Sequence, residues 1–112
     1  MRIIDLHCYP NTQKWIDCQG PYVDALEKYW GRAWQAKTEE EVIAEFTEFG
    51  IDAMLVALDL TTTIETPPCD NDYVAGMRDR HDAIIQAWAT VEPVLGQAAI
   101  DEAKHAINDL NM

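Results

Sequence analysis

Three short apolar runs, separated by segments with helical spacing, constrain the fold of this chain more than any other feature. The runs lie at residues 2–6, 53–58 and 84–91. The second run, from Ala53 to Leu58, is continuous, shows no alternation with polar residues and is too short for a buried helix. A strand of this kind is covered on both faces, which is typical of parallel sheets.

Two helices are predicted between the first and second runs. The first lies between Pro21, which suits a first helical turn, and Gly31, a natural stop, whereas residues 11–20 are polar and rich in turn formers. The second begins at Thr38, because Thr38 and Glu41 have the spacing of a capping box, and it ends at Gly50. Its predicted apolar face consists of Val42, Phe46 and Phe49.

Two more helices follow the second and third runs. After a loop at 59–70, Asn71 is a suitable N-cap for a helix over 72–81. A last helix over 96–110 is predicted from apolar residues on one face, namely Ala99, Ala103, Ala106, Ile107 and Leu110. Strands that alternate with helices predict an α/β fold of about three parallel strands with right-handed crossovers. Open doubly wound sheets and (β/α)8 barrels both begin in this way, and periodicity alone does not separate them.

Composition limits the functional classes. The 112 residues suffice for one domain, and a net charge of −12 disfavours both nucleic acid and anionic membrane surfaces as partners. No apolar run has the ~20 residues needed to cross a bilayer, and the N-terminus does not resemble a signal peptide. Cys8, Cys18 and Cys69 are odd in number and lack C-x-x-C spacing, so we expect reduced thiols and a cytoplasmic protein.

Polar side chains follow each predicted strand. The carboxyl ends of parallel strands meet at one edge, so we expect His7 and Tyr9 to lie near Asp59, residues 61–63 and Glu92. Carboxylates with an imidazole suit a divalent cation, although His7 is equally explained as a hydrogen-bonded structural residue. Period-two alternation places Asp5 on the face of His7, where it could accept the second ring N–H or cap a loop.

The remaining aromatic and histidine residues are less informative. The long stretch after the first strand carries an aromatic cluster, which consists of Trp15, Tyr22, Tyr29, Trp30 and Trp34. Such residues pack cores in most proteins, or else they form the wall or lid of a pocket. His81 and His105 lie in or beside predicted helices, and we expect both at the surface.

The first strand also carries a family resemblance. Residues Asp5 to Tyr9 resemble the D-x-H-x-H signature that opens the amidohydrolase superfamily. The ordered set of later segments resembles its amidohydrolase-related branch, which includes aminocarboxymuconate-semialdehyde decarboxylase-like enzymes. These segments are residues 50–56, 71–74, 80–81 and 89–93 with the alanine-rich helix behind them, so the resemblance covers nearly the whole chain.

The resemblance implies the N-terminal part of a metal-dependent (β/α)8 barrel, an incomplete barrel truncated at the C-terminus. It implies a hydrolase of amides or esters, or a carboxy-lyase, acting on a small-molecule substrate. His7 carries over as a ligand of a divalent metal, usually zinc. Tyr9 replaces the second histidine, so the site either has one ligand fewer or uses Tyr9, with Asp59, as a substrate contact. The catalytic residues are expected beyond residue 112, and the chain alone should have negligible activity.

Two other functional classes are compatible with the residues. The first is a non-catalytic α/β binding or oligomerisation module, whose third strand, lacking Lys and internal Pro, would expose a hydrogen-bonding edge suited to a homo-oligomer. The second, an acidic cation buffer, requires clustered D-x-D-type loops, whereas the chain has a single such spacing at Asp70 and Asp72. Residues 1–112 are therefore expected to form a single partial amidohydrolase-related domain.

Overall fold

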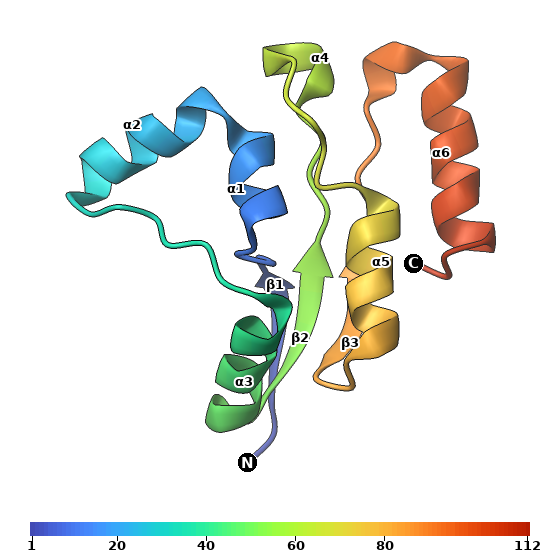
Figure 1. Ribbon diagram of the computed structural model, residues 1–112. Helices are drawn as coiled ribbons and strands as arrows, with labels where there is room; N and C mark the ends of the chain where they lie inside the picture. The colour runs from blue at the N-terminus through green and yellow to red at the C-terminus, as the bar shows by residue number, and fades with distance from the viewer.

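A parallel sheet of three strands is the framework of the molecule (Figure 1). The computed structural model describes residues 1–112. Strands β1 (Ile3–Cys8), β2 (Ile51–Val56) and β3 (Ile84–Trp88) lie side by side in chain order, and both pairings are parallel. The predicted α/β class with three parallel strands is confirmed. The second strand begins and ends two residues earlier than predicted, and the third ends at Trp88 instead of Val91.

Six α-helices and one 3-10 turn connect and follow the strands. The connection from β1 to β2 contains α1 (Gln13–Gln19), α2 (Pro21–Trp30) and α3 (Glu39–Phe49). The connection from β2 to β3 contains α4 (Thr61–Ile64) and α5 (Asn71–Arg80), and β3 is followed by the 3-10 turn Pro93–Leu95 and α6 (Gln97–Asn108). None of these helices combines the length and the apolar character needed to span a bilayer.

The predicted ends of α3 are confirmed in detail. The Thr38 hydroxyl accepts the Glu41 backbone N–H at 3.2 Å, and the Glu41 carboxylate accepts the Thr38 backbone N–H at 2.8 Å. This reciprocal pair satisfies two amides that the first turn would leave without partners. Gly50 ends the helix with φ of 66°, a left-handed conformation that favours glycine, and β2 starts at the next residue.

Other local predictions need correction. Residues 13–19, predicted as turn-rich, form α1, and the predicted loop at 59–70 contains the single turn of α4. The N-cap of α5 is Asp70, whose carboxylate accepts the Tyr73 backbone N–H at 2.9 Å, and not Asn71. Asn71 instead uses its side chain to hold the segment that follows β3.

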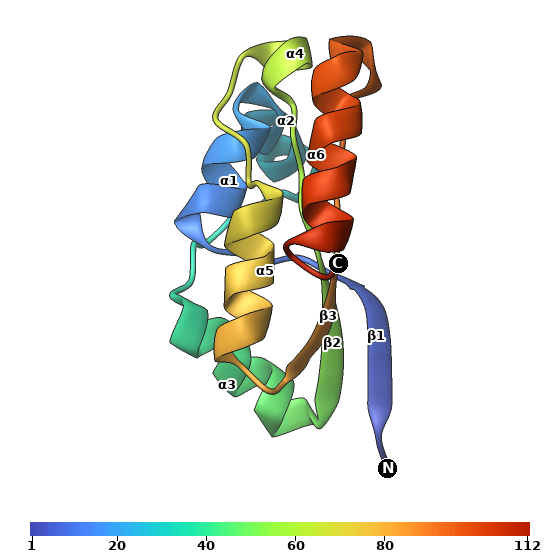
Figure 2. The ribbon, with the colours of Figure 1, turned by 90° about the vertical axis from the view of Figure 1, so that its right-hand side faces the viewer.

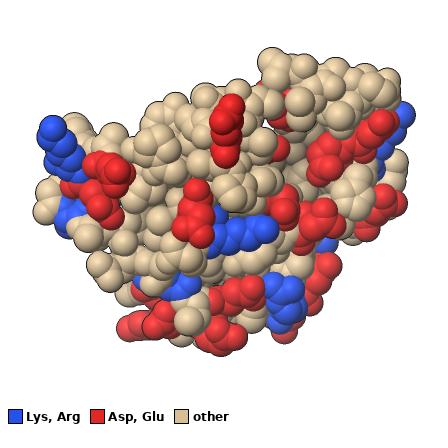
Figure 3. All heavy atoms as spheres, turned by 45° about the horizontal axis from the view of Figure 1, so that its top comes forward, with Lys and Arg blue, Asp and Glu red and all other residues tan.

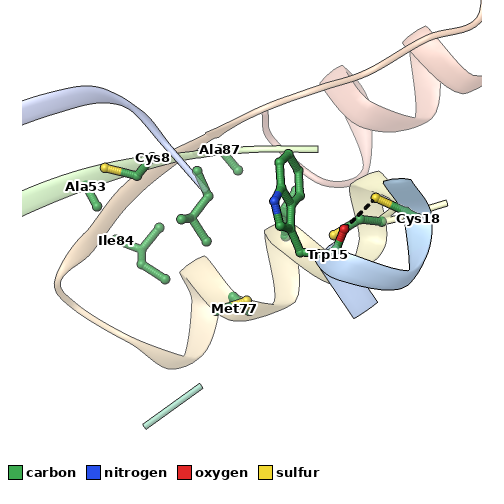
Figure 4. Packing of buried hydrophobic residues seen from close by; sticks show 10 residues of the cluster. Cys8, Trp15, Cys18, Ala53, Met77, Ile84 and Ala87 are labelled. Atoms are coloured by element: carbon green, nitrogen blue, oxygen red, sulfur yellow. Dashed lines mark hydrogen bonds between the residues drawn. The ribbon is translucent and has the colours of Figure 1, made fainter. Parts of the chain in front are cut away.

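One face of the sheet carries the core (Figure 4). Ala53 and Leu55 of β2 and Ala87 of β3 point toward the helices and are at most 1% exposed. Figures 1 and 2 show α1, α3 and α5 on this side of the sheet. The buried cluster also contains residues from β1, α1, α5, β3 and the β2–α5 connection, which are Cys8, Trp15, Cys18, Cys69, Val74, Met77 and Ile84.

The opposite face of the sheet is not covered by a helix along the strands (Figure 2). We call this surface the open face, and it consists of Ile4, Leu6, His7, Met54, Val56, Ile85 and Trp88. Ile4, Leu6 and Trp88 are each at least half exposed. The expectation that the second strand is covered on both faces is therefore wrong for this chain, because helices lie on only one side.

Two predicted apolar helix faces are only partly buried. In α3, Val42 is buried and Phe46 packs against the core, but Phe49 is 64% exposed. In α6, Ala99 and Ala106 are buried, whereas Ile107 is 65% exposed.

Acidic side chains are spread over the surface with basic ones between them (Figure 3), which leaves no large basic patch on the face shown there.

Candidate pocket at the strand ends

An extra residue in β1 determines the direction of His7. Asp5 pairs with Ala53 and Cys8 pairs with Leu55, so three steps along β1 match two steps along β2. This irregularity is a β-bulge, a feature that often re-aims a side chain beside a functional site. Because Cys8 takes the position that faces the core, His7 lies on the open face.

His7 and Tyr9 line a pocket at the carboxyl ends of all three strands. The pocket has a volume of about 530 Å³, within the range of small-molecule sites, and we call it the central pocket. His7 and Tyr9 come from the end of β1. The other lining residues come from α1, from α2 and the segment after α2, and from the ends of β2 and β3. They are Trp15, Gln19, Leu26, Trp30, Trp34, Val56, Ala57, Leu58, Trp88, Ala89 and Thr90.

Aromatic rings dominate the wall of the central pocket. The Tyr9 ring stacks on Trp15, with centroids 4.9 Å apart, and meets His7 edge to face at 5.3 Å. Trp30 and Trp34 lie 5.5 Å apart at a tilted angle. Three members of the predicted aromatic cluster, Trp15, Trp30 and Trp34, therefore contribute to a pocket wall, whereas Tyr22 and Tyr29 do not line it.

A second pocket, of about 440 Å³, shares three of these rings. Tyr9, Trp30 and Trp34 line both pockets, and the second one adds Arg32 and Lys37. Basic residues thus adjoin the aromatic wall, although they do not line the central pocket itself. A planar organic group in the central pocket would contact rings and the His7 imidazole, and a polar extension would reach the basic side.

Asp59 and Glu92 lie in a different place from His7. They line a separate pocket of about 290 Å³ between the start of α5 and the start of α6, together with Asp70, Asp72 and Glu102. The Asp59 carboxylate accepts the Thr61 backbone N–H at 2.8 Å and so holds the entry to α4. The structure therefore brings His7 and Tyr9 together but does not gather Asp59 and Glu92 beside them.

Asp5 does not act on the His7 ring as the alternation of side chains predicts. Because of the bulge, Asp5 and His7 lie on opposite faces, and the Asp5 carboxylate accepts the His7 backbone N–H at 3.0 Å. This hydrogen bond, with a weaker contribution from the Cys8 thiol, lowers the pKa of Asp5. The carboxylate therefore stabilises the bulge instead of orienting the imidazole.

The three thiols are free and buried. Burial raises the pKa of Cys8 and of Cys69 to about 12 and raises that of Cys18, so all three stay protonated and unreactive near neutral pH. His81, expected at the surface, is partly buried: its ring lies 3.1 Å from the Glu39 carboxylate, and the side chain is 20% exposed. His105 lies at the surface between Asp109 and Asp72, whose hydrogen bonds raise its pKa.

The chain does not by itself present a metal centre. No group of three or more His, Cys, Asp or Glu side chains is arranged to hold a metal ion, and the central pocket contains no Cys, Asp or Glu beside His7. Catalytic zinc sites use three protein ligands and a water. A metal at this position would require ligands other than those within residues 1–112.

The residue most clearly missed by sequence reasoning is Trp88. Its indole N–H reaches from β3 across β2 and donates a 2.7 Å hydrogen bond to the Leu6 carbonyl of β1. The available signal was its position at the end of a strand, facing away from the buried Ala87.

Comparison with protein-family models, curated proteins and solved structures finds no match to this chain.

Proposed function

We propose that this chain supplies one wall of a parallel α/β barrel enzyme of the amidohydrolase-related kind. In this proposal β1, β2 and β3 are neighbouring strands of the barrel, and the open face lines its interior. The reaction is hydrolysis of an amide or ester bond, or non-oxidative decarboxylation, of a small organic substrate. The chain alone has negligible activity, because the remaining strands and their side chains complete the site.

The central pocket is the observation that carries this proposal. It lies on the open face at the carboxyl ends of three parallel strands, where enzymes with parallel sheets bind their substrates. Its wall contains four polar side chains, those of His7, Tyr9, Gln19 and Thr90, among aromatic and aliphatic ones. A pocket with few polar groups in an apolar wall is the usual form of a small-molecule site.

The side chains suggest separate roles within the pocket. The indole rings of Trp15, Trp30 and Trp34 exclude water and provide flat surfaces against which a ring or conjugated substrate packs. The His7 imidazole can donate or accept a hydrogen bond at a substrate oxygen, and the Tyr9 hydroxyl can donate a second one. Exclusion of water by the apolar wall would strengthen these interactions.

A metal ion is implied by the family resemblance, but the residues of this chain do not fit one on their own. His7 is the only side chain that the resemblance assigns as a ligand, and Tyr9 occupies the position of the second histidine. The hydrogen bonds that His7 and Tyr9 offer a substrate in the pocket do not require a metal.

The test uses the protein in the form in which cells make it, beside its His7→Ala variant. Release of CO2 from carboxylated rings and hydrolysis of aryl amides and esters would be measured for both. We expect His7→Ala to lower kcat/KM by about a hundredfold or more, the size of effect typical for removal of a hydrogen-bond donor at the reacting oxygen. Equal rates for the two proteins would exclude His7 from the site.

An oligomerisation module is the second candidate, and exposed apolar surface favours it. Ile4, Leu6 and Trp88 are each at least half exposed on one continuous face, and β1 and β3 each present an unpaired edge. Copies of this chain that pair through these surfaces would bury them without a catalytic role. Measurements of association and of activity separate the two candidates.

A further inference from the structure

We propose that Asp5 and Trp88 are positioning residues that hold the bulge in β1 and thereby keep His7 in the central pocket. The inference rests on the proposed function only for the use of His7. The geometry of the bulge is independent of it. Neither residue contacts the His7 ring through a hydrogen bond, so both act through the backbone.

The pairing of β1 with β2 shows what the bulge achieves. Without the extra residue, the step from Asp5–Ala53 would continue with His7 opposite Leu55, whose side chain is fully buried. His7 would then face the helices, and Cys8 would face the open side. In the structure Cys8 pairs with Leu55 and is 7% exposed, so the bulge exchanges the directions of these two side chains.

Asp5 stabilises one side of the bulge. Its Oδ1 atom accepts the His7 backbone N–H at 3.0 Å, which gives that amide a partner within the irregular segment. An Asp side chain that bonds the amide two residues ahead favours a turn-like backbone over a regular strand. The acceptor is an ionised oxygen, and such hydrogen bonds are stronger than neutral ones.

Trp88 stabilises the other side of the bulge. Its Nε1–H donates to the Leu6 carbonyl at 2.7 Å, so a side chain of β3 satisfies a backbone group of β1 across the intervening strand. The indole spans the end of the open face and also lines the central pocket. Asp5 and Trp88 therefore fix the two residues of the bulge, Leu6 and His7, from opposite sides of the sheet.

Loss of the bulge has a chemical signature, because it would bring Cys8 out of the core. We would label the folded chain with iodoacetamide and follow each cysteine by mass spectrometry. Trypsin places Cys8, Cys18 and Cys69 on separate peptides, since Lys14 lies between the first two and Lys28 and Lys37 lie between the second and the third. Cys18 and Cys69 are fully buried and report global unfolding in the same sample.

The variants are Asp5→Ala, Asp5→Asn and Trp88→Phe. Asp5→Ala removes the acceptor and should raise the labelling rate of Cys8 at least about tenfold relative to Cys18 and Cys69, the factor expected for losing a hydrogen bond to a charged group. Asp5→Asn keeps an amide oxygen that can accept the same N–H and should label close to the wild-type rate. Trp88→Phe should raise Cys8 labelling, whereas Trp30→Phe, a matched change on the same pocket wall, should not.

A second reagent reports on His7, whose side-chain direction the bulge exchanges with that of Cys8. Diethyl pyrocarbonate modifies exposed imidazoles, and His7 is exposed in the wild-type chain. In Asp5→Ala we expect carbethoxylation of His7 to slow while alkylation of Cys8 accelerates. A merely local loosening of β1 would accelerate both reactions, so the reciprocal change identifies an exchange of faces.

Several outcomes would overturn the proposal. These are wild-type labelling of Cys8 in folded Asp5→Ala, equal acceleration in Asp5→Asn and Asp5→Ala, or acceleration of both Cys8 and His7. If Asp5→Ala labels all three cysteines alike, it has unfolded, and Trp88→Phe decides: no selective labelling of Cys8 there overturns the proposal. The labelling needs no substrate, so a failure of the proposed enzymatic function leaves its result intact.

Discussion

At the scale of single residues, Asn71 joins three separate segments through one buried amide. Asn71 is only 2% exposed. Its Nδ2 donates to the Thr90 carbonyl at 2.8 Å and to the Glu102 carboxylate at 2.6 Å. Its Oδ1 accepts the Thr90 backbone N–H at 2.8 Å. The first residue of α5 thus fixes the segment that leaves β3 and the middle of α6.

Replacing Asn71 should therefore destabilise the chain more than replacing a polar side chain at the surface would. Asn71→Ala leaves both backbone groups of Thr90 without this partner in a partly buried place, which costs about 2–4 kcal/mol of the free energy of unfolding. Urea denaturation followed by circular dichroism measures the change. Asn108→Ala, at an exposed position of α6, is the control and should stay within about 0.5 kcal/mol of wild type.

Single residues also show where sequence reasoning fails. Alternation predicts Asp5 and His7 on one face, but one inserted residue reverses the prediction, and no rule of composition locates that insertion in a run as short as residues 3–8. The role of Asn71 as a side-chain bridge depends on Thr90, which lies 19 residues away. Such partners are set by tertiary packing, and local spacing cannot identify them.

At the scale of elements, one carboxylate connects the start of α3 to the end of α5. Glu39 accepts hydrogen bonds from Arg80 at 2.8 Å and lies 3.1 Å from the His81 ring. Burial alone would raise the pKa of Glu39, but the hydrogen bonds from Arg80 and His81 outweigh it and lower the pKa below the usual 4.5. The ionised form is therefore favoured in the folded state.

This lowered pKa predicts a specific acid dependence. A group whose folded pKa is depressed contributes stability above its unfolded pKa, near 4.5, and loses it as the pH falls through the lower folded value. Glu39→Gln should thus lower the urea midpoint at neutral pH, and its difference from wild type should shrink below pH 4.5. Glu40→Gln, at an exposed neighbour, should show no such trend. A constant difference at all pH values would contradict the assignment.

The elements themselves were predictable where local chemistry decides them. The capping pair Thr38 and Glu41 and the left-handed Gly50 fix α3, and both were evident in the sequence. Helix α1 was missed because Thr12 makes no side-chain cap and the segment is only seven residues long. Its buried residues, Trp15 and Cys18, are spaced three apart, which was the available signal.

At the scale of the whole molecule, the uncovered side of the sheet determines how the chain behaves in solution. Exposed apolar side chains on a continuous face favour association, and the proposed barrel would bury this face against its own interior. The central pocket lies at one end of the same face, so any partner that covers the face also affects access to the pocket.

Charged substitutions on this face should therefore reduce association without unfolding the chain. Ile4 is 51% exposed and Ile85 is 38% exposed, so the substitutions Ile4→Lys and Ile85→Lys remove little buried apolar contact. We expect sedimentation velocity over a concentration series to show less self-association for both than for wild type. Ile107→Lys makes the same change on α6, and an equal effect there would show that the open face is not the surface through which copies associate.

Metal content gives a further prediction for the whole chain. A single imidazole provides too few ligands for tight zinc binding, so the 112-residue chain should retain less than stoichiometric zinc after equilibration and desalting. Elemental analysis of wild type and His7→Ala should give the same low value. One zinc per wild-type chain, lost in the variant, would reveal ligands that the structure does not bring together.

The order of the strands has a consequence for how the molecule is made. β2 and β3 each pair with the strand synthesised immediately before them, so each finds its neighbour already present when it emerges from the ribosome. The longest wait falls between Cys8 and Ile51, while α1, α2 and α3 are translated. During that interval the first strand has no partner strand. Its isoleucines are the exposed apolar side chains that a chaperone would be expected to shield.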